Sequence, residues 1–403
     1  MTIKEEENMS STTQPPPAAG PESPVAGGEQ LHRRQLGTAH LVFFIVAASA
    51  PLTAVAGGQA ATYLVTGNQG IPFLFIPLAI ILGIFAVGYA AMSHHVADAG
   101  AFYTYVARGL GKIPGVAAAF IALVSYNAMQ IGIFGLFGAA TAGFMADQFS
   151  LEAQWYVWCF VGIAIVGVLG LLQIDLNARV LGVALILEVL VIAIFDFAIL
   201  ADPGPQGLTG VGFTPGAATE TALGAALVFT VASFVGFESA AIYSEETKDP
   251  KRTVAKATFI AVAAIGVFYA LSSWLLANAV GPDTIVDPGA LVEGGFTVDG
   301  ENPDPTTALF VTGEERLGGF YADVATALFC TSLFAAVLAF HNAVARYFYA
   351  VGREGVFPKA FGRVHPRTGA PFVGSLTQTA LAASVIAVFA ILEEDPVLKL
   401  FTW

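Results

Sequence analysis

Long apolar segments separated by short polar ones run along the chain from about residue 40 onward. Each apolar run is close to or longer than the ~20 residues that an α-helix needs to cross the hydrocarbon core of a bilayer. The pattern predicts membrane helices near residues 40–65, 71–93, 115–145, 155–173, 179–201, 222–243, 257–280, 319–348 and 372–392, and the start of a tenth in the final VLKLFTW. We therefore expect an all-α polytopic membrane protein.

The composition agrees with this class. Of the 403 residues, 56% are hydrophobic and 12% are charged, which is roughly half the charged fraction of an average soluble domain. The two cysteines, Cys159 and Cys330, both fall inside apolar runs. Neither a disulfide framework nor a metal site is therefore predicted, and both are expected to be packing residues.

The charged residues predict how the chain is divided and oriented. Residues 1–35 are polar and rich in Glu, Ser, Thr and Pro, which predicts a disordered tail before a transmembrane domain over residues 36–403. When the helices alternate across a bilayer, nearly all Lys and Arg residues after residue 32 fall on one side, and the segment 281–319 on the other side is acidic. The positive-inside rule then places the N-terminus in the cytoplasm, and we expect a multi-pass protein of the plasma (inner) membrane.

One of the apolar runs is interrupted by polar residues near the expected mid-depth of the membrane. Residues 231–239 read VASFVGFES and contain Gly236, Glu238 and two serines. A charge at the bilayer centre costs roughly 2.5 to 3.5 kcal/mol on insertion scales, so a carboxylate there calls for a function. This sixth helix is expected to be broken where a solute can reach it.

The first helix carries a similar interruption, AASAPLTAVAGG, over residues 47–58. Pro51 has no backbone N–H and clashes with the preceding turn, which predicts a kink or an unwound segment over residues 49–53. An ordinary proline kink is the alternative for this helix alone. Two interruptions five helices apart instead indicate an inverted-repeat secondary transporter, with helices 1–5 and 6–10 as repeats and the site between them.

The chemistry of two broken helices suits a zwitterion. Half-helix N-termini offer unpaired N–H groups and a positive dipole end to an anion, and the carbonyl groups of the other break accept hydrogen bonds from an ammonium group. An amino acid carries both groups.

Three segments resemble the amino acid/polyamine/organocation (APC) permeases. GAFYTYVARGLG (100–111) resembles the GGxYxYxxxxxG signature before their third helix. FVGFES followed by SEETKDPKRTV resembles their sixth helix and the loop after it, and RYFYAVGREGVFPKAFGRVHPRTGAP (346–371) resembles the segment after their eighth. The resemblance runs from about residue 36 to the end and implies a 5+5, LeuT-like fold. Members usually have twelve helices, so we expect this chain to be truncated at the start of the tenth helix.

The resemblance also implies where a substrate binds. Many members have a Gly-Ser-Gly break in helix 1, where this chain has Ser49, Ala50 and Pro51. The residues expected to border the substrate carboxylate are Ala50, Pro51, Leu52 and Thr53, and those expected to face the amine are Ala232, Phe234, Val235 and Gly236. For Phe234, packing within the helix bundle is the alternative to a role as an aromatic gate.

Three ionisable residues are candidates for proton coupling. Members carry a glutamate at the place of Glu238 that has been proposed to respond to protons; a hydrogen-bonded link between helices is the alternative. Glu188 lies near a position where some proton-coupled members have a lysine in place of a sodium ion, and a carboxylate there is suited to a proton or a cation. His341 is a candidate proton relay or a structural histidine.

Helix 3 adds two polar candidates. Tyr126 and Gln130 are one turn apart and share a face, which suits side-chain contacts to a substrate. Polar residues also join membrane helices to one another, and this alternative stays open.

The sequence contains no HExxH, GxxxxGK[ST] or GxSxG motif, so neither an enzyme nor a cofactor or metal site is predicted. Basic residues follow the inner membrane face and form no nucleic-acid patch. We expect a secondary active transporter of amino acids or related amines that works by alternating access, with proton-coupled uptake. The alternatives are an amino acid/amine antiporter and a non-transporting truncated paralogue that acts as a receptor or regulator. Nothing in the sequence indicates an oligomeric state.

Overall fold

The computed structural model describes residues 37–93, 101–172, 178–238, 250–297 and 300–402. In this part of the chain the secondary structure is helical, and the one β-type pairing is an isolated bridge between Thr297 and Pro303. Eight spans in the described residues are long and apolar enough to cross a membrane. The predicted all-α membrane architecture is confirmed, and the predicted disordered tail lies outside the described residues.

The long helices lie within or close to the predicted apolar ranges. In the first half, one interrupted span comprises α1 (Thr38–Ala48), the π-helix η1 (Thr53–Gln59) and α2 (Ala60–Thr66), and it is followed by α3 (Ile71–Ser93), α5 (Lys112–Phe149), α6 (Trp155–Leu172) and α7 (Ala178–Ala201). In the second half the corresponding elements are α9 (Leu223–Ala232), α11 (Pro250–Val280), α14 (Gly319–Arg353), α15 (Phe372–Ile391) and the π-helix η5 (Pro396–Phe401).

Shorter elements connect these helices. They are α4 (Ala101–Leu110), η2 (Val211–Phe213), α8 (Pro215–Glu220), α12 (Pro288–Glu293), η4 (Pro305–Thr307) and α13 (Ala308–Leu317). Several have a side chain that caps the first turn: Thr214 accepts the Ala217 N–H of α8, and Asp287 accepts the Ala290 N–H of α12. Such caps satisfy backbone donors that have no partner within the helix.

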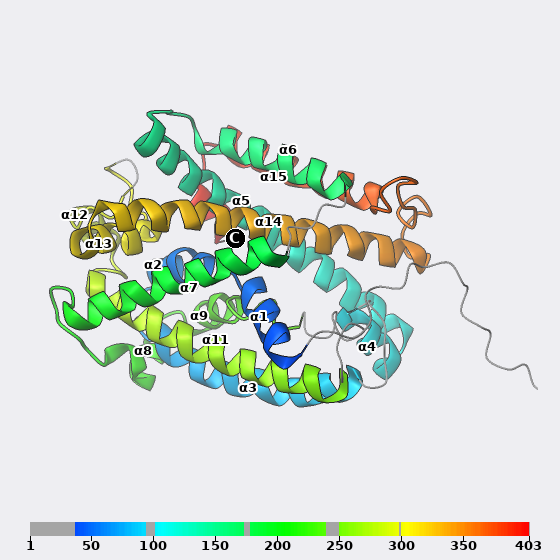
Figure 1. Cartoon of the computed structure of the whole chain (residues 1–403), viewed down its shortest axis with the longest axis horizontal. Coiled ribbons are helices and arrows are strands. Elements are labelled where there is room, and N and C mark those ends of the chain that lie inside the picture. Colours follow the sequence, from blue (N-terminus) through cyan, green and yellow to red (C-terminus); the bar gives the residue numbers. More distant parts are fainter. Residues whose placement is uncertain (1–36, 94–100, 173–177, 239–249, 298–299, 403) are drawn as a thin grey trace, which may run out of the picture.

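The long helices surround a centre that contains the short half-helices. Helix α3 lies beside α11, α5 packs against α14, and α6 packs against α15. Figure 1 shows α1 and α9 in the middle of this arrangement, while α4 and the pair α12 and α13 lie at opposite ends of the long axis. The two interrupted helices are therefore enclosed by the rest of the bundle.

The first interruption lies where the sequence predicts it. Helix α1 ends at Ala48, and Ala50 adopts a left-handed conformation with φ +44° before Pro51 restarts the helix. A residue before proline disfavours the right-handed helical conformation, because the proline ring crowds its backbone. The restarted helix is wider than an α-helix over Thr53–Gln59. The surrounding helices bury this segment. At membrane depth, backbone that is not α-helical is tolerated only where it is buried in protein or faces water.

The second interruption faces the first. Helix α9 ends at Ala232, and residues 233–238 form turns rather than a continuous helix. Gly236 has φ +106°, and a Cβ atom added to it would lie 2.8 Å from the Cβ of Ala48. Only glycine adopts this φ without strain and allows such a close approach. The two breaks are therefore in direct contact.

Candidate functional site

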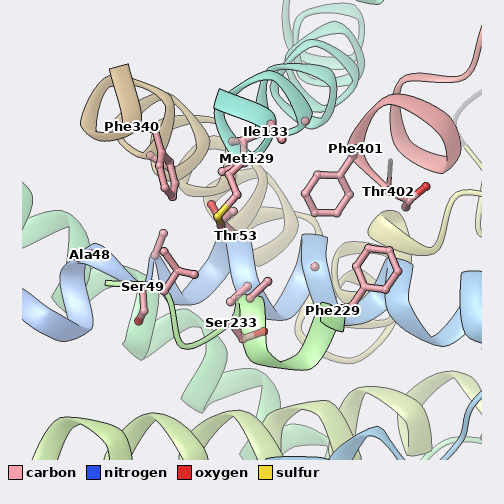
Figure 2. Close-up of a pocket in the computed structure, with 18 of the residues that line it drawn as sticks. Ala48, Ser49, Thr53, Met129, Ile133, Phe229, Ser233, Phe340, Phe401 and Thr402 are labelled. Carbon is pink, nitrogen blue, oxygen red and sulfur yellow. The ribbon is translucent and has the colours of Figure 1, made fainter. Parts of the chain in front are cut away.

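A cavity of about 280 Å³ lies between the two breaks and three further helices. Figure 2 shows its residues, with Phe340 on one side and the rings of Phe229 and Phe401 on the other. The lining residues are Ala48, Ser49, Ala50, Thr53, Ala54, Gly58, Ala128, Met129, Gly132, Ile133, Val228, Phe229, Ala232, Ser233, Val235, Ala336, Phe340, Phe401 and Thr402. The first, third, sixth, eighth and tenth helical segments of the bundle thus meet at one place.

The wall of this cavity is largely apolar. Its side-chain polar groups are the hydroxyls of Ser49, Thr53, Ser233 and Thr402, together with the thioether of Met129, and none of the described lining residues is basic or acidic. Small alanine and glycine side chains expose main-chain groups at the two breaks. Such a site binds a small solute by backbone groups and hydroxyls at one part and by apolar contacts elsewhere.

Glu188 connects the helix 1 break to two other helices. This residue of α7 is buried, and its carboxylate accepts the Leu52 N–H at 3.2 Å and the Ser332 hydroxyl at 3.0 Å. The Ser332 hydroxyl also lies 2.9 Å from Thr53 Oγ1, which lines the cavity. The carboxylate thus lies directly behind the break, two hydrogen bonds from the lining residue Thr53 by way of Ser332.

Glu238 makes the corresponding contacts at the helix 6 break. It is buried, and its carboxylate accepts the Tyr126 hydroxyl at 2.7 Å and the Gly236 N–H at 2.9 Å. Tyr89 donates to its main-chain oxygen at 2.6 Å. Both groups that donate to the carboxylate are uncharged. Tyr126 and Glu238, predicted from different helices, are therefore brought together.

The predicted substrate-contact residues divide into two groups. Ala50, Thr53, Ala232 and Val235 line the cavity. Pro51 and Leu52 lie within the break but outside the lining, and Gly236 forms the contact between the two breaks. Tyr126 contacts Glu238 rather than the cavity.

Three further candidates contact neighbouring helices. These contacts agree with the alternatives of packing and inter-helix hydrogen bonding given for them above. Gln130 donates to the Val337 carbonyl at 3.0 Å and accepts a hydrogen bond from Gln378. Phe234 packs against the ring of Phe75, with centroids 5.7 Å apart. The His341 ring nitrogen Nε2 lies 2.8 Å from the Ser375 hydroxyl of α15. None of Gln130, Phe234 and His341 is among the lining residues.

The cavity also contains residues that the sequence did not single out. Met129 and Ile133 of α5 follow Tyr126 by three and seven residues and share its side of the helix. Phe340 of α14 and Phe401 of η5 complete the apolar wall. Helical spacing alone would connect Met129 with Ile133, because they are one turn apart. Which face of a wholly apolar helix turns inward depends on packing, so no periodic signal distinguishes it.

Comparison with known proteins identifies the family. A model of the amino acid permease family matches residues 36–403. The chain belongs to the amino acid permease family. The permease is 25% identical over 336 residues to the low-affinity putrescine importer PlaP of Escherichia coli K12, covering 80% of this chain and 68% of that protein. It is 23% identical over 351 residues to the branched-chain amino acid permease BcaP of Bacillus subtilis, covering 81% of this chain and 69% of that one.

A solved structure establishes the fold of the permease. The structure is of a sodium-coupled sialic acid symporter in a substrate-bound outward-open state. It matches with a TM-score of 0.53 at 14% identity, covering 89% of this chain and 75% of that chain. The permease therefore has the inverted-repeat, LeuT-like transporter fold, and the resemblance to APC permeases is confirmed. It is a multi-pass membrane protein, and its family and relatives are transporters rather than enzymes.

Proposed function

We propose that this permease moves amino acids or related amines across the membrane by alternating access. The observation that carries the proposal is the cavity between two helix breaks that touch each other at Gly236 and Ala48. In transporters with inverted repeats, substrate sites lie at such discontinuous helices near the membrane midplane. The PlaP and BcaP relatives are named for an amine and for amino acids, which supports both substrate classes.

Glu238 is the group that we assign to proton coupling. A buried carboxyl group in a membrane protein is costly in its charged form, so it exchanges protons when its surroundings change. Its partners Tyr126 and Gly236 belong to α5 and to the helix 6 break. Tyr126 belongs to the first repeat and Glu238 to the second, so a movement of one repeat against the other alters the contact between them, which links proton binding to the change of access.

Glu188 is assigned a supporting part in this coupling. Its carboxylate joins α7 to Leu52 in the helix 1 break and to Ser332 of α14. Glu188 belongs to the opposite repeat from Ser332, so the same relative movement changes the contact between these two residues. His341 contacts Ser375 on the neighbouring α15. This contact joins it to neither helix break, unlike those of Glu188 and Glu238, so the geometry supports a relay through it less well.

The orientation proposed from the sequence fits the two ends of the bundle. In Figure 1, α4 and the C-terminal end of α14 lie at the end of the bundle opposite α12 and α13. The last turn of α4 contains Arg108, and that of α14 contains Arg353. The segment that contains α12 is acidic, with Asp283, Asp287 and Glu293. We place the basic end in the cytoplasm of the plasma (inner) membrane, which also puts the N-terminus there.

Uptake into proteoliposomes tests the proposal. The purified chain is reconstituted, and uptake of labelled leucine, putrescine and 3-methylbutylamine is measured with and without an inward proton gradient. We expect uptake of at least one compound, accelerated by the gradient. Glu238→Gln is expected to abolish this acceleration, whereas Glu220→Gln, on the exposed α8 outside the site, is expected to preserve it.

The same assay separates the alternative functions. Uptake that depends on preloaded internal substrate and not on protons would favour an antiporter. Binding of a compound without any flux would favour a receptor or regulator. A proton-dependent uptake that is unchanged in Glu238→Gln would remove the coupling role from this residue.

A further inference from the structure

Another acid lies within the membrane spans, outside the cavity and the two breaks. Asp196 belongs to α7, and its carboxylate oxygen Oδ2 accepts the Ser272 hydroxyl of α11 at 2.7 Å. Its other carboxylate oxygen, Oδ1, is buried and has no hydrogen-bond partner in the described part of the chain. Burial removes the water that would otherwise stabilise the charge on this oxygen, so the charged form is costly here.

The two glutamates at the breaks have more donors than Asp196. Glu188 accepts one main-chain N–H and one hydroxyl, and so does Glu238. Asp196 accepts a single hydrogen bond among the described residues, from the Ser272 hydroxyl. Of these three carboxyl groups, Asp196 therefore has the fewest protein donors to stabilise a negative charge, and a bound proton removes that charge.

The polar groups that the neighbouring elements α14 and α13 contribute are engaged elsewhere. Tyr321 of α14 interacts electrostatically with Asp196, but its hydroxyl donates to the Val191 carbonyl at 3.0 Å. The guanidinium group of Arg316 in α13 donates to the Asp202 carbonyl at 2.9 Å and pairs with the preceding residue of its own helix. No described basic side chain forms an ion pair with Asp196.

Three further titratable groups face other parts of the bundle. The Tyr269 hydroxyl of α11 lies 2.8 Å from the Ser49 hydroxyl. Glu188, eight residues before Asp196 on α7, accepts its bonds from the helix 1 break and from α14. His40 lies in the first turn of α1, at the proposed cytoplasmic end. The charge of Asp196 is therefore left with one hydroxyl as its described partner.

Asp196 lies where water on the outer side can supply a proton. It is five residues before the end of α7 at Ala201, which is roughly 8 Å along the helix axis. The Asp202 carbonyl accepts Arg316 of α13, so this end of α7 lies at the end of the bundle that we place outside. The side chain as a whole is half-buried rather than enclosed. A group that is costly when charged and close to water can exchange a proton readily.

The donor atoms at this place suit a proton better than a metal ion. A Ca²⁺ or Mg²⁺ ion takes about six oxygen ligands. The contacts of Asp196 offer its own two carboxylate oxygens and one hydroxyl. Among the described residues, no group of three or more His, Cys, Asp or Glu side chains is placed to hold a metal ion. A proton needs a single acceptor oxygen, which Oδ1 provides.

We propose that Asp196 is a further proton-binding site of the permease, loaded from the outer side of the membrane. This assignment rests on the proposed transport function and adds an acid to its proton coupling. Asp196 belongs to the first repeat and Ser272 to the second, so a movement of one repeat against the other changes their contact. The Ser272 hydroxyl stabilises the charged carboxylate, so this movement changes the affinity of Asp196 for a proton. Each transport cycle then carries one proton more than Glu238 alone would carry.

Infrared spectroscopy of the purified full chain in liposomes tests whether Asp196 holds a proton. A protonated carboxyl group has a C=O stretching band that a carboxylate lacks, and it is measured at pH values above the usual carboxyl range, where exposed acids are charged. We expect Asp196→Asn to remove the share of one carboxyl group from this band. Asp202→Asn is the matched control, because Asp202 directly follows α7 and is exposed. Equal bands in the two variants would overturn the proposal.

A second variant changes the proton affinity of Asp196 without removing its carboxyl group. Ser272→Ala deletes the described donor to the charged form. We expect the infrared band to persist to a pH about one unit higher than in the unaltered chain. A band that titrates as in the unaltered chain would contradict the proposal. If Asp196→Asn does not fold, this titration decides.

Uptake by proteoliposomes separates this proposal from the function on which it rests. For leucine, putrescine and 3-methylbutylamine, the number of protons carried per molecule follows from the pH gradient that balances a given substrate gradient. We expect this number to fall by one in Asp196→Asn. A lost infrared band together with no uptake of any compound by the unaltered chain would leave Asp196 as a proton site while the transport function fails. Proton-driven uptake with an unchanged number of protons in Asp196→Asn would leave transport standing and overturn the extra proton.

Discussion

Replacing Gly236 by alanine tests whether the two helix breaks must touch for the cavity to form. The residue has φ +106°, a conformation that residues with a Cβ atom rarely adopt. The added Cβ would lie 2.8 Å from the Cβ of Ala48 and 3.0 Å from its carbonyl carbon. Because one of these neighbours is backbone, α1 itself has to move to relieve the clash.

The two costs add in the same direction. The unfavourable backbone conformation costs about 1–3 kcal/mol, and overpacking of a close contact costs about 1–3 kcal/mol more. The arrangement of breaks is then destabilised by about 2–6 kcal/mol relative to arrangements in which they separate. At about 1.4 kcal/mol per factor of ten, the lower limit already reduces the ratio of touching to separated arrangements about 30-fold.

Ligand affinity and thermal unfolding measure this effect. Because binding requires the populated cavity, we expect Gly236→Ala to weaken binding of a transported compound at least tenfold and to lower the unfolding temperature. Gly224→Ala is the control, since Gly224 lies in α9, the helix that leads into the break, with nothing within 4 Å of an added Cβ. If Gly236→Ala binds and unfolds like Gly224→Ala, the contact between the breaks does not shape the site.

Two further changes test the helix contacts and the outer surface. Gln130→Leu leaves the side-chain amide of Gln378 without its partner and should destabilise the chain by about 1–3 kcal/mol in thermal unfolding. The double variant with Gln378→Leu should recover most of this loss. A double variant that does not recover stability would count against a paired contact. The Asp283 carboxylate accepts hydrogen bonds from the side-chain amides of Gln69 and Gln206. These bonds, first that of Gln69, hold the pKa of Asp283 below its usual range. These bonds therefore stabilise the fold at pH values above the usual carboxyl pKa. Their contribution is lost as the pH falls through the lowered pKa of Asp283. Asp283→Asn should remove that acid-dependent part of stability, less than about 1 kcal/mol because the side chain is exposed, and an identical pH profile of unfolding in both proteins would refute the assignment.

The helices and both breaks follow from local signals in the sequence. Apolar length defines the spans, because the bilayer sets a minimum length for each. Pro51 predicts the first break through the backbone donor it lacks, and Gly236 and Glu238 mark the second by their cost inside a membrane helix. These signals act within one turn of the chain, so they need no knowledge of tertiary packing.

The lining of the cavity does not follow from such signals. Tyr126 and Gln130 share a face of α5, yet Tyr126 reaches Glu238 while Gln130 bonds to α14 and α15. Phe234 lies in the break itself but packs against Phe75, whereas Phe229, one turn before the break, faces the cavity. In a bundle whose helices are apolar on all sides, inward and outward faces have similar hydrophobicity, so packing decides the difference.

The contacts of the two buried glutamates change what a pair of broken helices implies. Two breaks by themselves offer donors to an anion and acceptors to a cation, which suits an amino acid. Glu188 takes the Leu52 N–H and Glu238 takes the Gly236 N–H, so donors of both breaks are engaged within the protein, and on the acceptor side the Ala232 carbonyl accepts the Val235 N–H. The selectivity of such a site therefore depends on which half-helix ends the protein's own carboxylates neutralise, and each carboxylate comes from a position that the backbone breaks do not specify.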